Sequence, residues 1–286
     1  MKLEVKQDSQ EKKLVFLDID GTLIDMETGI LPDSTKTAIK KARENGHKVF
    51  ICSGRCKAIV PSYILETGFD GMVCSAGAYV EAEGKVIFHQ PLLAEDLKEI
   101  VDFLNDKKIG FFLEANERLY TLPEYKRMFW EREELANRSE REDFKQFFQN
   151  IQEIRIEDAI GRNDINKLTF FSMKNCVDDI KNQLADKFMV ITSSMEKAAV
   201  TGGEISAKTI TKAEGIRMVL DHYNMGKEAT LAIGDSMNDK EMIQFAQVGI
   251  AMGNAIDAIK EVADDITAEV MGDGIYKSFL KYGLLD

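Results

Sequence analysis

Short apolar runs recur along the chain, and several of them stop abruptly at a polar residue. The first covers residues 14–17 and is followed at once by Asp18-Ile19-Asp20-Gly21-Thr22. Similar runs at 48–52 and 72–74 lead into Ser53-Gly54-Arg55 and Ser75-Ala76-Gly77-Ala78. A run that is apolar on both faces is typical of an interior strand in a parallel sheet. We therefore predict three such strands in the N-terminal part of the chain.

Helical patterns alternate with these strands. Residues 34–45 predict a helix that Ser34 caps and Gly46 ends, and apolar strands are expected later at 230–233 and 248–252. Four apolar residues share one face of a further helix: Ile216, Val219, Leu220 and Tyr223. Alternating strands and helices form βαβ units with right-handed crossovers. The predicted fold class is α/β, with a Rossmann-like parallel-sheet core.

The middle of the chain has a different pattern. Aromatic residues are dense from about residue 88, and alternating segments such as 167–171 are typical of antiparallel strands with one wet face. Two heavily charged segments are expected to be helical: 124–135 and 141–149. We expect an α+β domain at 88–196, inserted into a core domain formed by 1–87 and 197–286.

Composition narrows the class of protein. A chain of 286 residues fits two domains, and the balance of 37 basic against 49 acidic side chains gives a net charge of −12. Because there is no block of Lys and Arg, nucleic acid is disfavoured as a partner. A small anionic substrate would need a local source of positive charge, such as a metal ion.

Neither the amino-terminal residues nor the cysteines suggest export. The chain lacks a stretch of 18 uncharged apolar residues and its first residues alternate in charge, so we expect neither a membrane span nor a signal peptide, and a cytoplasmic location by default. The four cysteines show no CxxC spacing and are expected to be reduced thiols: Cys52, Cys56, Cys74 and Cys176.

Candidate chemistry gathers where strands end. Asp18, Ser53 and Asp235 each follow a predicted strand directly, and ligands of open α/β sheets bind outside the carboxyl ends of the strands. A turn at Asp20-Gly21-Thr22 would explain Asp20 but not Asp18. Buried carboxylates at one point cost several kcal/mol unless a cation compensates them, and oxygen ligands suit Mg²⁺. The scattered histidines, His47, His89 and His222, do not indicate a transition metal.

Lys212 has two interpretations from the residues alone. It begins a predicted helix on the side where strands end, so it could screen a substrate phosphate and the carboxylates. It could equally be an ordinary solvated charge.

Four segments together resemble a known family. The blocks at residues 18–22, 53–55, 212 and 234–239 look like the four motifs of the haloacid dehalogenase superfamily, in the expected order. The insertion resembles the type II (IIB) cap of its Cof-like sugar-phosphatase branch, and the likeness runs from Leu14 onward. One departure is Ala76, where that branch usually has asparagine, which puts specificity carried by that position in doubt.

The resemblance implies a Mg²⁺-dependent phosphatase acting on a small phosphorylated metabolite. Asp18 would attack phosphorus and form an aspartyl phosphate, and Asp20 would serve as general acid and base. Mg²⁺ would be held by the Asp18 side chain, the Asp20 backbone carbonyl and Asp235. Lys212 would stabilise the transferring phosphoryl group.

The resemblance also implies a set of substrate contacts. Ser53 and backbone N–H groups near Gly21 and Gly54 would bind phosphoryl oxygens, and Asn238 and Asp239 would orient Lys212, metal waters or the phosphate edge. The cap at 88–196 would close over the site and exclude water. Its candidate leaving-group contacts are Glu114, Asn116, Arg118 and Arg162.

Alternative functions remain at this point. A phosphomutase would share all four blocks, and a non-catalytic phosphoryl-acceptor module could store phosphate on Asp18. A serine esterase built on Ser236 is excluded, because its histidine base would have to follow and no histidine follows His222. The physiological substrate and the oligomeric state are left open.

Overall fold

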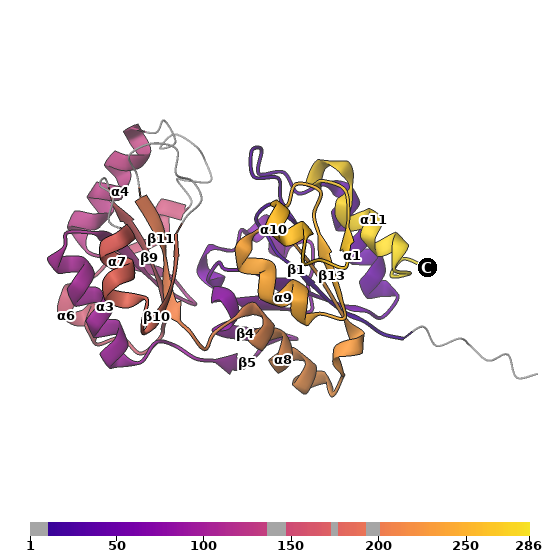
Figure 1. Cartoon of the computed structure of the whole chain (residues 1–286), viewed down its shortest axis with the longest axis horizontal. Coiled ribbons are helices and arrows are strands. Elements are labelled where there is room, and N and C mark those ends of the chain that lie inside the picture. Colours follow the sequence, from indigo (N-terminus) through magenta and orange to yellow (C-terminus); the bar gives the residue numbers. More distant parts are fainter. Residues whose placement is uncertain (1–10, 136–146, 173–176, 193–200) are drawn as a thin grey trace, which may run out of the picture.

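The computed structural model describes residues 11–135, 147–172, 177–192 and 201–286. Within them lie two sheets, each with its own helices and hydrophobic cluster, and the two resulting domains stand side by side along the long axis (Figure 1). We call the domain with the eight-stranded sheet the core and the domain with the six-stranded sheet the cap. The predicted α/β class is confirmed.

The core sheet is mostly parallel. Its strands stand in the order β14-β13-β12-β1-β2-β3-β4-β5. The pairs from β14 to β3 are parallel, whereas β4 pairs in antiparallel fashion with both β3 and β5. Their bounds are β1 (Leu14–Leu17), β2 (Lys48–Cys52), β3 (Gly71–Cys74), β4 (Tyr79–Ala82), β5 (Lys85–His89), β12 (Thr230–Gly234), β13 (Val248–Ala251) and β14 (Asp265–Ile266). β1 lies in the middle, which explains why all four of its residues are buried.

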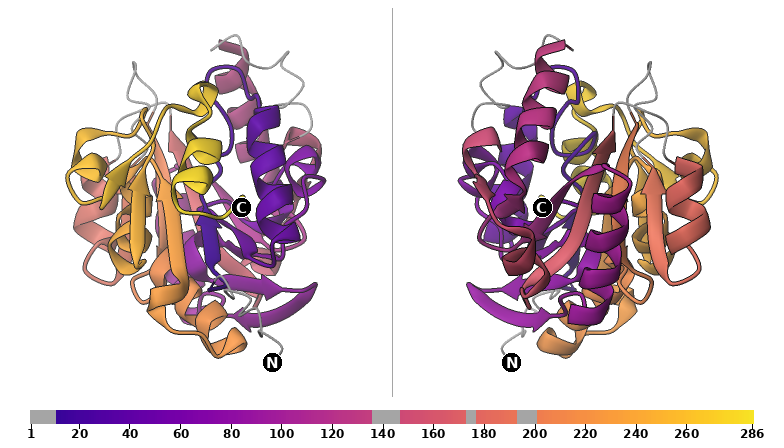
Figure 2. Two further views of the ribbon diagram at one scale, coloured as in Figure 1. Left: turned by 90° about the vertical axis from the view of Figure 1, so that its right-hand side faces the viewer. Right: turned by 90° about the vertical axis from the view of Figure 1, so that its left-hand side faces the viewer.

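Helices cover the core sheet. They are α1 (Asp33–Glu44), α2 (Ser62–Leu65), α8 (Lys212–Tyr223), α9 (Lys240–Phe245), α10 (Asp257–Lys260) and α11 (Gly274–Lys281). Viewed from the core end, α11 in yellow lies beside α1 in indigo (Figure 2, left). The predicted cap of α1 is wrong, because Pro32 occupies the N-cap and the Ser34 hydroxyl donates to Asp273. Gly46 does follow the helix, with φ of +88°.

The cap sheet has the order β10-β11-β9-β6-β7-β8. Its strands are β6 (Gly110–Ala115), β7 (Leu119–Thr121), β8 (Ile151–Glu153), β9 (Ile165–Ser172), β10 (Phe188–Thr192) and β11 (Thr201–Ala207), and β7 and β8 are its parallel pair. Its helices are α3 (Ala94–Asp106), α4 (Pro123–Leu135), α6 (Ile156–Ile160) and α7 (Val177–Leu184). Most of the helix expected at 141–149 lies outside the described residues.

The strand pairing places the boundaries between core and cap at other residues than the sequence predicts. β5 continues the core sheet to His89, and β11 pairs with β9 and β10 in the cap although residues 201–207 were assigned to the core. The physical reason is that β11 fills the place between two cap strands, so its backbone groups are satisfied only there. The two connections therefore lie at about 90–93 and 208–211, where the Gln90 amide donates to Thr209 Oγ1.

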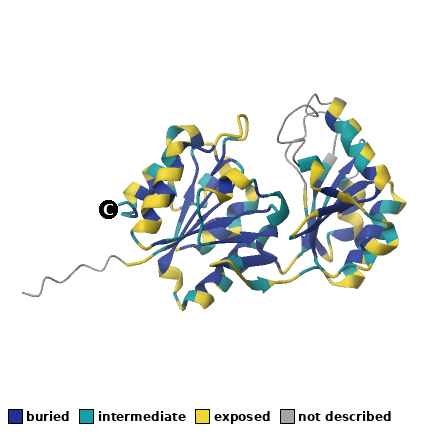
Figure 3. Ribbon diagram, turned by 180° about the vertical axis from the view of Figure 1, so that it is seen from behind, coloured by how far each residue is buried: buried dark blue, intermediate teal, exposed yellow. Residues whose placement is uncertain are grey.

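Burial follows the sheets. Figure 3 shows the strands of both domains largely in dark blue, with yellow exposed positions gathered on the helices. Within the described residues, no helix combines the length and apolarity that a membrane span needs. Cys52, Cys56 and Cys74 are buried free thiols, as expected, and Cys176 lies outside the described residues.

Candidate active site

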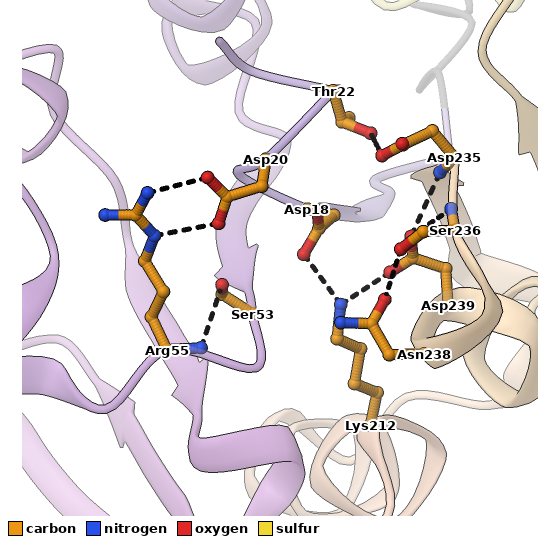
Figure 4. A network of polar contacts seen from close by, with 10 residues as sticks. All are labelled: Asp18, Asp20, Thr22, Ser53, Arg55, Lys212, Asp235, Ser236, Asn238 and Asp239. Carbon is orange, nitrogen blue, oxygen red and sulfur yellow. Dashed lines mark hydrogen bonds and ion pairs between the residues drawn. The ribbon is translucent and has the colours of Figure 1, made fainter. Parts of the chain in front are cut away.

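The strand ends of the core converge. Asp18 directly follows β1, and its backbone N–H donates to Ile233 of neighbouring β12 at 3.1 Å. Ser53 follows β2, and Asp235 follows β12. Asp18 and Ser53 are buried, at 2% and 1% exposure. Figure 4 shows these side chains around one centre, as the parallel order of the strands requires.

Lys212 occupies the middle of the cluster. It is the first residue of α8, and its Nζ donates to Asp18 Oδ1 at 2.6 Å and to Asp239 Oδ1. The ion pairs with both carboxylates raise the pKa of Lys212 above its ordinary range against the opposing effect of burial. Burial and the nearby charge of Asp239 raise the pKa of Asp18, which Lys212 opposes. Of the two interpretations of Lys212, the solvated charge is wrong.

A short backbone contact fixes where α8 begins. Ser75, Ala76 and Gly77 all have positive φ, of 50°, 55° and 113°. A Cβ on Gly77 would lie 2.1 Å from the carbonyl oxygen of Thr211, the N-cap of α8. Because no side chain fits there, Gly77 lets the segment approach Thr211 and so places Lys212.

Asp239 makes more contacts in the site than the role predicted for it from the sequence requires. Its Oδ2 accepts the backbone N–H groups of Asp235 and Ser236, both at 3.0 Å, while Oδ1 accepts from Lys212. Single carboxylate oxygens of Asp18, Asp235 and Asp239 lie within 4.8 Å of one another. This all-oxygen donor set fits a hard divalent cation such as Mg²⁺. The Asp20 side chain is not part of the set, and the expected contribution of its backbone carbonyl stays a prediction.

Asp235 is held against the first motif. Its Oδ1 accepts from the Thr22 hydroxyl at 3.1 Å, and a Cβ on Gly21 would lie 2.4 Å from its Oδ2. Gly21 has φ of +81°, so this position needs glycine for both conformation and space. Burial and the charge of Asp239 raise the pKa of Asp235 to about 7. Such a shift marks a carboxylate whose charge lacks compensation, which a cation would supply.

Asp20 faces Arg55. The guanidinium donates from Nε to Asp20 Oδ2 at 2.8 Å and from Nη2 to Oδ1 at 2.6 Å. The sequence pattern predicts no role for Arg55, although the residue belongs to the second block. The signal was its place immediately after Ser53-Gly54, at the same strand end as the other candidates.

Ser53, Gly54 and Asn238 form the remaining wall. Ser53 Oγ accepts from the backbone N–H of Arg55 at 3.2 Å, and Asn238 Oδ1 accepts from Ser236 Oγ at 2.7 Å. A Cβ on Gly54 would lie 3.2 Å from Asn238 Nδ2. The second and fourth blocks therefore meet across this gap.

Asn254 is a second residue of the site that the sequence pattern does not reveal. Its side-chain amide donates to the Gly21 carbonyl at 2.7 Å, and its Oδ1 accepts from the Val270 backbone at 3.3 Å. It thus fixes the turn that brings Gly21 against Asp235. Nothing in the local pattern around Asn254 distinguishes it from an ordinary loop asparagine.

The four cap candidates lie in different surroundings. Glu114 is buried and accepts from Thr169, while Arg118 is exposed. Arg162 pairs with Asp164 and stacks over the Tyr120 ring, 3.8 Å from its centroid.

Asn116 belongs to a polar bridge to the core. Its Oδ1 accepts from the Asn166 amide at 2.7 Å, and the same amide donates to Ser75 Oγ in the core at 3.1 Å. His89 completes this bridge through Asn166 Oδ1 at 2.8 Å.

Comparison with known proteins identifies the family. The profile of the haloacid dehalogenase-like hydrolases matches residues 15–279. The chain belongs to this family. The expectation of a hydrolase with the family's cap and core is confirmed.

Individual relatives match over nearly their full lengths. YkrA of Bacillus subtilis strain 168 is 28% identical over 280 residues, covering 96% of this chain and 99% of YkrA. YitU of the same organism, a 5-amino-6-(5-phospho-D-ribitylamino)uracil phosphatase, is 26% identical, covering 94% of this chain and 97% of YitU. The structure of the subclass IIB sugar phosphatase BT4131 is 26% identical, with a TM-score of 0.77, and covers 96% of this chain and 100% of that one.

Proposed function

We propose that this protein is a Mg²⁺-dependent phosphatase that hydrolyses small phosphate monoesters through an aspartyl phosphate on Asp18. The observation that carries the proposal is the arrangement around Asp18. Its carboxylate is held by Lys212 beside Asp235 and Asp239, and a second carboxylate, Asp20, follows two residues later. A nucleophile, a positive charge, a cation site and a proton donor then lie together at the carboxyl ends of the core strands.

The first half-reaction transfers the phosphoryl group to the protein. An Asp18 oxygen attacks phosphorus while the bond to the ester oxygen breaks, and Asp20 gives that oxygen a proton so that an alcohol leaves. Lys212 already contacts Asp18 and supports the negative charge of the transferring group. In the second half-reaction, water attacks phosphorus, Asp20 takes its proton, and Asp18 is released with inorganic phosphate.

Mg²⁺ would be held by the Asp18 and Asp235 side chains and the Asp20 backbone carbonyl. When bound, it neutralises the repulsion between a phosphate dianion and the carboxylates. Asp239, whose carboxylate lies in the same cluster, would orient a metal water, and its contact with Lys212 holds that lysine.

The substrate phosphate would bind between the second and fourth blocks. Ser53 and the backbone N–H groups near Gly21 and Gly54 are the donors, and Asn238 lies across the gap from Gly54. Asp18 and Ser53 supply no positive charge of their own, so Lys212 and the cation must balance the phosphate. These residues would bind the phosphate group itself, so the leaving group would be bound by other residues.

The cap, at residues 88–196 in the sequence prediction and about 90–208 by its sheet, would exclude water and contact that leaving group. YitU is named for a phosphorylated ribitylaminouracil and BT4131 for sugar phosphates. By analogy, the substrate class proposed for this chain is a small phosphorylated metabolite with a hydroxyl-bearing leaving group.

A phosphate-release screen tests the proposal. Several dozen phosphate monoesters are incubated with the wild type and with Asp18→Asn, with and without Mg²⁺. We expect release that needs both the metal and the Asp18 carboxylate. Release that persists without either one would contradict the mechanism. Isomerised phosphate ester without free phosphate would indicate a phosphomutase, and Asp18 phosphorylated stably for hours would indicate a phosphoryl-acceptor module.

A further inference from the structure

Arg55 forms a two-point contact with Asp20, outside the cluster of carboxylates that could hold a cation. Its guanidinium engages both oxygens of Asp20, through Nε at 2.8 Å and Nη2 at 2.6 Å. Both side chains are partly exposed, at 28% and 35%, and the pair lies beside Asp18 and Ser53 (Figure 4). A planar fork that contacts both oxygens holds a carboxyl group in one orientation.

The same guanidinium is tied to the cap-facing segment. Its third nitrogen, Nη1, donates to the Ile59 carbonyl at 3.1 Å. Residues 56–59 of the core pack into the hydrophobic cluster of the cap: Cys56 is fully buried there, and Ala58 and Ile59 pack against it. The 3₁₀ turn at Lys57–Ile59 contacts β6 of the cap. Arg55 therefore connects Asp20 to the surface on which the cap rests.

The proposed chemistry makes the orientation of Asp20 decisive. Asp20 has to face the ester oxygen in one half-reaction and water in the next, and a carboxylate free to rotate would do neither well. We propose that Arg55 is a positioning residue that orients Asp20 for proton transfer and couples this orientation to the seating of the cap on residues 56–59. The inference rests on the proposed phosphatase function.

Leaving groups of different basicity separate this role from a merely structural one. An alkoxide needs a proton as it departs, whereas para-nitrophenolate leaves without one. The value of kcat/KM reports steps up to departure of the leaving group, and kcat also includes hydrolysis of the aspartyl phosphate. A misplaced Asp20 should therefore lower kcat/KM for an alkyl phosphate and spare it for an aryl phosphate.

The experiment compares Arg55→Met and Arg55→Lys with the wild type on β-glycerophosphate and para-nitrophenyl phosphate in Mg²⁺. General acid–base catalysis contributes about 10²–10⁴-fold. We expect Arg55→Met to lose about 10²-fold in kcat/KM on the alkyl ester and less than about 5-fold on the aryl ester. On the aryl ester its kcat should fall, with a burst of para-nitrophenol. Arg55→Lys should rescue only part, because an ammonium lacks the fork.

A matched control exists at the opposite edge of the sheet. Arg43 also donates to both oxygens of one carboxylate, Asp70, through Nε at 2.9 Å and Nη2 at 3.4 Å. Asp70 precedes β3, so this pair lies at the amino ends of the strands, away from the site. Arg43→Met should keep the ratio of alkyl to aryl kcat/KM at its wild-type value.

The cap coupling has its own pair of variants. Ile59→Ala should show the same leaving-group pattern, with a several-fold loss on the alkyl ester. Ile160→Ala removes equivalent atoms from the far part of the cap cluster and should leave the alkyl-to-aryl ratio unchanged. Equal effects of the two substitutions on that ratio would overturn the coupling.

Several outcomes would overturn the role of Arg55. One is a uniform loss on both esters, and another is an Arg55→Lys variant equal to wild type. If Arg55→Met does not fold, Arg55→Lys and Ile59→Ala still decide the question. A wild type that releases no phosphate from any ester is distinguishable, because it refutes the phosphatase function itself, and the positioning role falls with it.

Discussion

Lys212 shows at the scale of one residue how charge is balanced in this site. It is 1% exposed and lies between Asp18 and Asp239, which are 2% and 0% exposed. Three charges are thus removed from water together, and each depends on the others. One lysine charge balances only one of the two carboxylate charges. The group therefore keeps a net charge of about −1 even without Asp235.

Removing that lysine should be costly. We expect Lys212→Met to destabilise the metal-free protein by about 3–5 kcal/mol, because Asp18 and Asp239 would remain buried without a partner. Urea unfolding monitored by circular dichroism measures the loss. Lys181→Met, at an exposed position of α7, is the control and should change stability by less than about 0.5 kcal/mol. A loss below about 1 kcal/mol for Lys212→Met would contradict this account.

Substitution of Asp235 should have the opposite effect on the stability of the metal-free protein. Its pKa is raised from 3.8 to about 7, so its protonated form favours folding at low pH and this contribution is lost as the pH rises through 7. At pH 8, Asp235→Asn should therefore raise the melting temperature of the metal-free protein, by roughly 2–4 °C per kcal/mol of repulsion removed. The same substitution should abolish stabilisation by Mg²⁺. Thermal melts with EDTA and with Mg²⁺ test both, and a lower melting temperature in EDTA would refute the explanation.

At the scale of an element, the turn at Ser75–Gly77 sets the start of α8. Ala76 adopts φ of 55° and ψ of 25° with a half-exposed side chain, a left-handed conformation that asparagine tolerates better than alanine. The departure noticed in the sequence therefore has a conformational side, independent of any lost substrate contact. The backbone keeps the left-handed shape even though the residue is less suited to it.

Two substitutions in this turn should act in opposite directions. Ala76→Asn should stabilise the protein by about 0.5–1 kcal/mol, since the left-handed conformation costs a non-glycine residue about 1–2 kcal/mol and asparagine less. Gly77→Ala should destabilise it by several kcal/mol and lower phosphate release, because its Cβ would clash with Thr211. Urea unfolding and the phosphate assay measure both. Equal stabilities of Gly77→Ala and the wild type would show that α8 can shift freely.

At the scale of the whole molecule, the described residues join the domains through two connections, the packing of residues 56–59 against the cap cluster, and a polar bridge. Asn166 of β9 is 2% exposed and donates to Ser75 Oγ, which is fully buried in the core. The bridge lies beside the turn that sets α8. The contact that holds the cap and the turn that positions Lys212 therefore lie next to each other.

A double-mutant cycle measures this bridge. Asn166→Ala and Ser75→Ala should each destabilise the protein by about 1–3 kcal/mol, because each leaves a buried polar partner unsatisfied. Together they should cost less than the sum, with a coupling of about 0.5–1.5 kcal/mol. Asn166→Ala paired with the distant Ser278→Ala in α11 is the control and should be additive. Additivity in the first cycle would mean that the bridge is not coupled energetically.

The sequence predicted the core well because its signals are local. The apolar run at 14–17 and the acidic residues that follow it specify a buried strand and a charged strand end without reference to the rest of the chain. The helix predicted at 34–45 agrees with α1 to within one residue. Its predicted cap is wrong, because Pro32 occupies the N-cap and the Ser34 hydroxyl donates to Asp273, which is distant in sequence. The boundary at 196 was misplaced because pairing of β11 with β9 depends on residues about thirty positions away.

By itself, then, the sequence determined which residues carry charge and where the strands end, because strand order and apolar burial follow from short patterns. Tertiary structure alone decided how the charges pair. It placed Asp239 rather than the Asp20 side chain with Asp18 and Asp235, gave Asp20 to Arg55, and used Asn254 to hold the Gly21 turn. Contacts between distant segments depend on side-chain direction to within an ångström, and no local pattern encodes that.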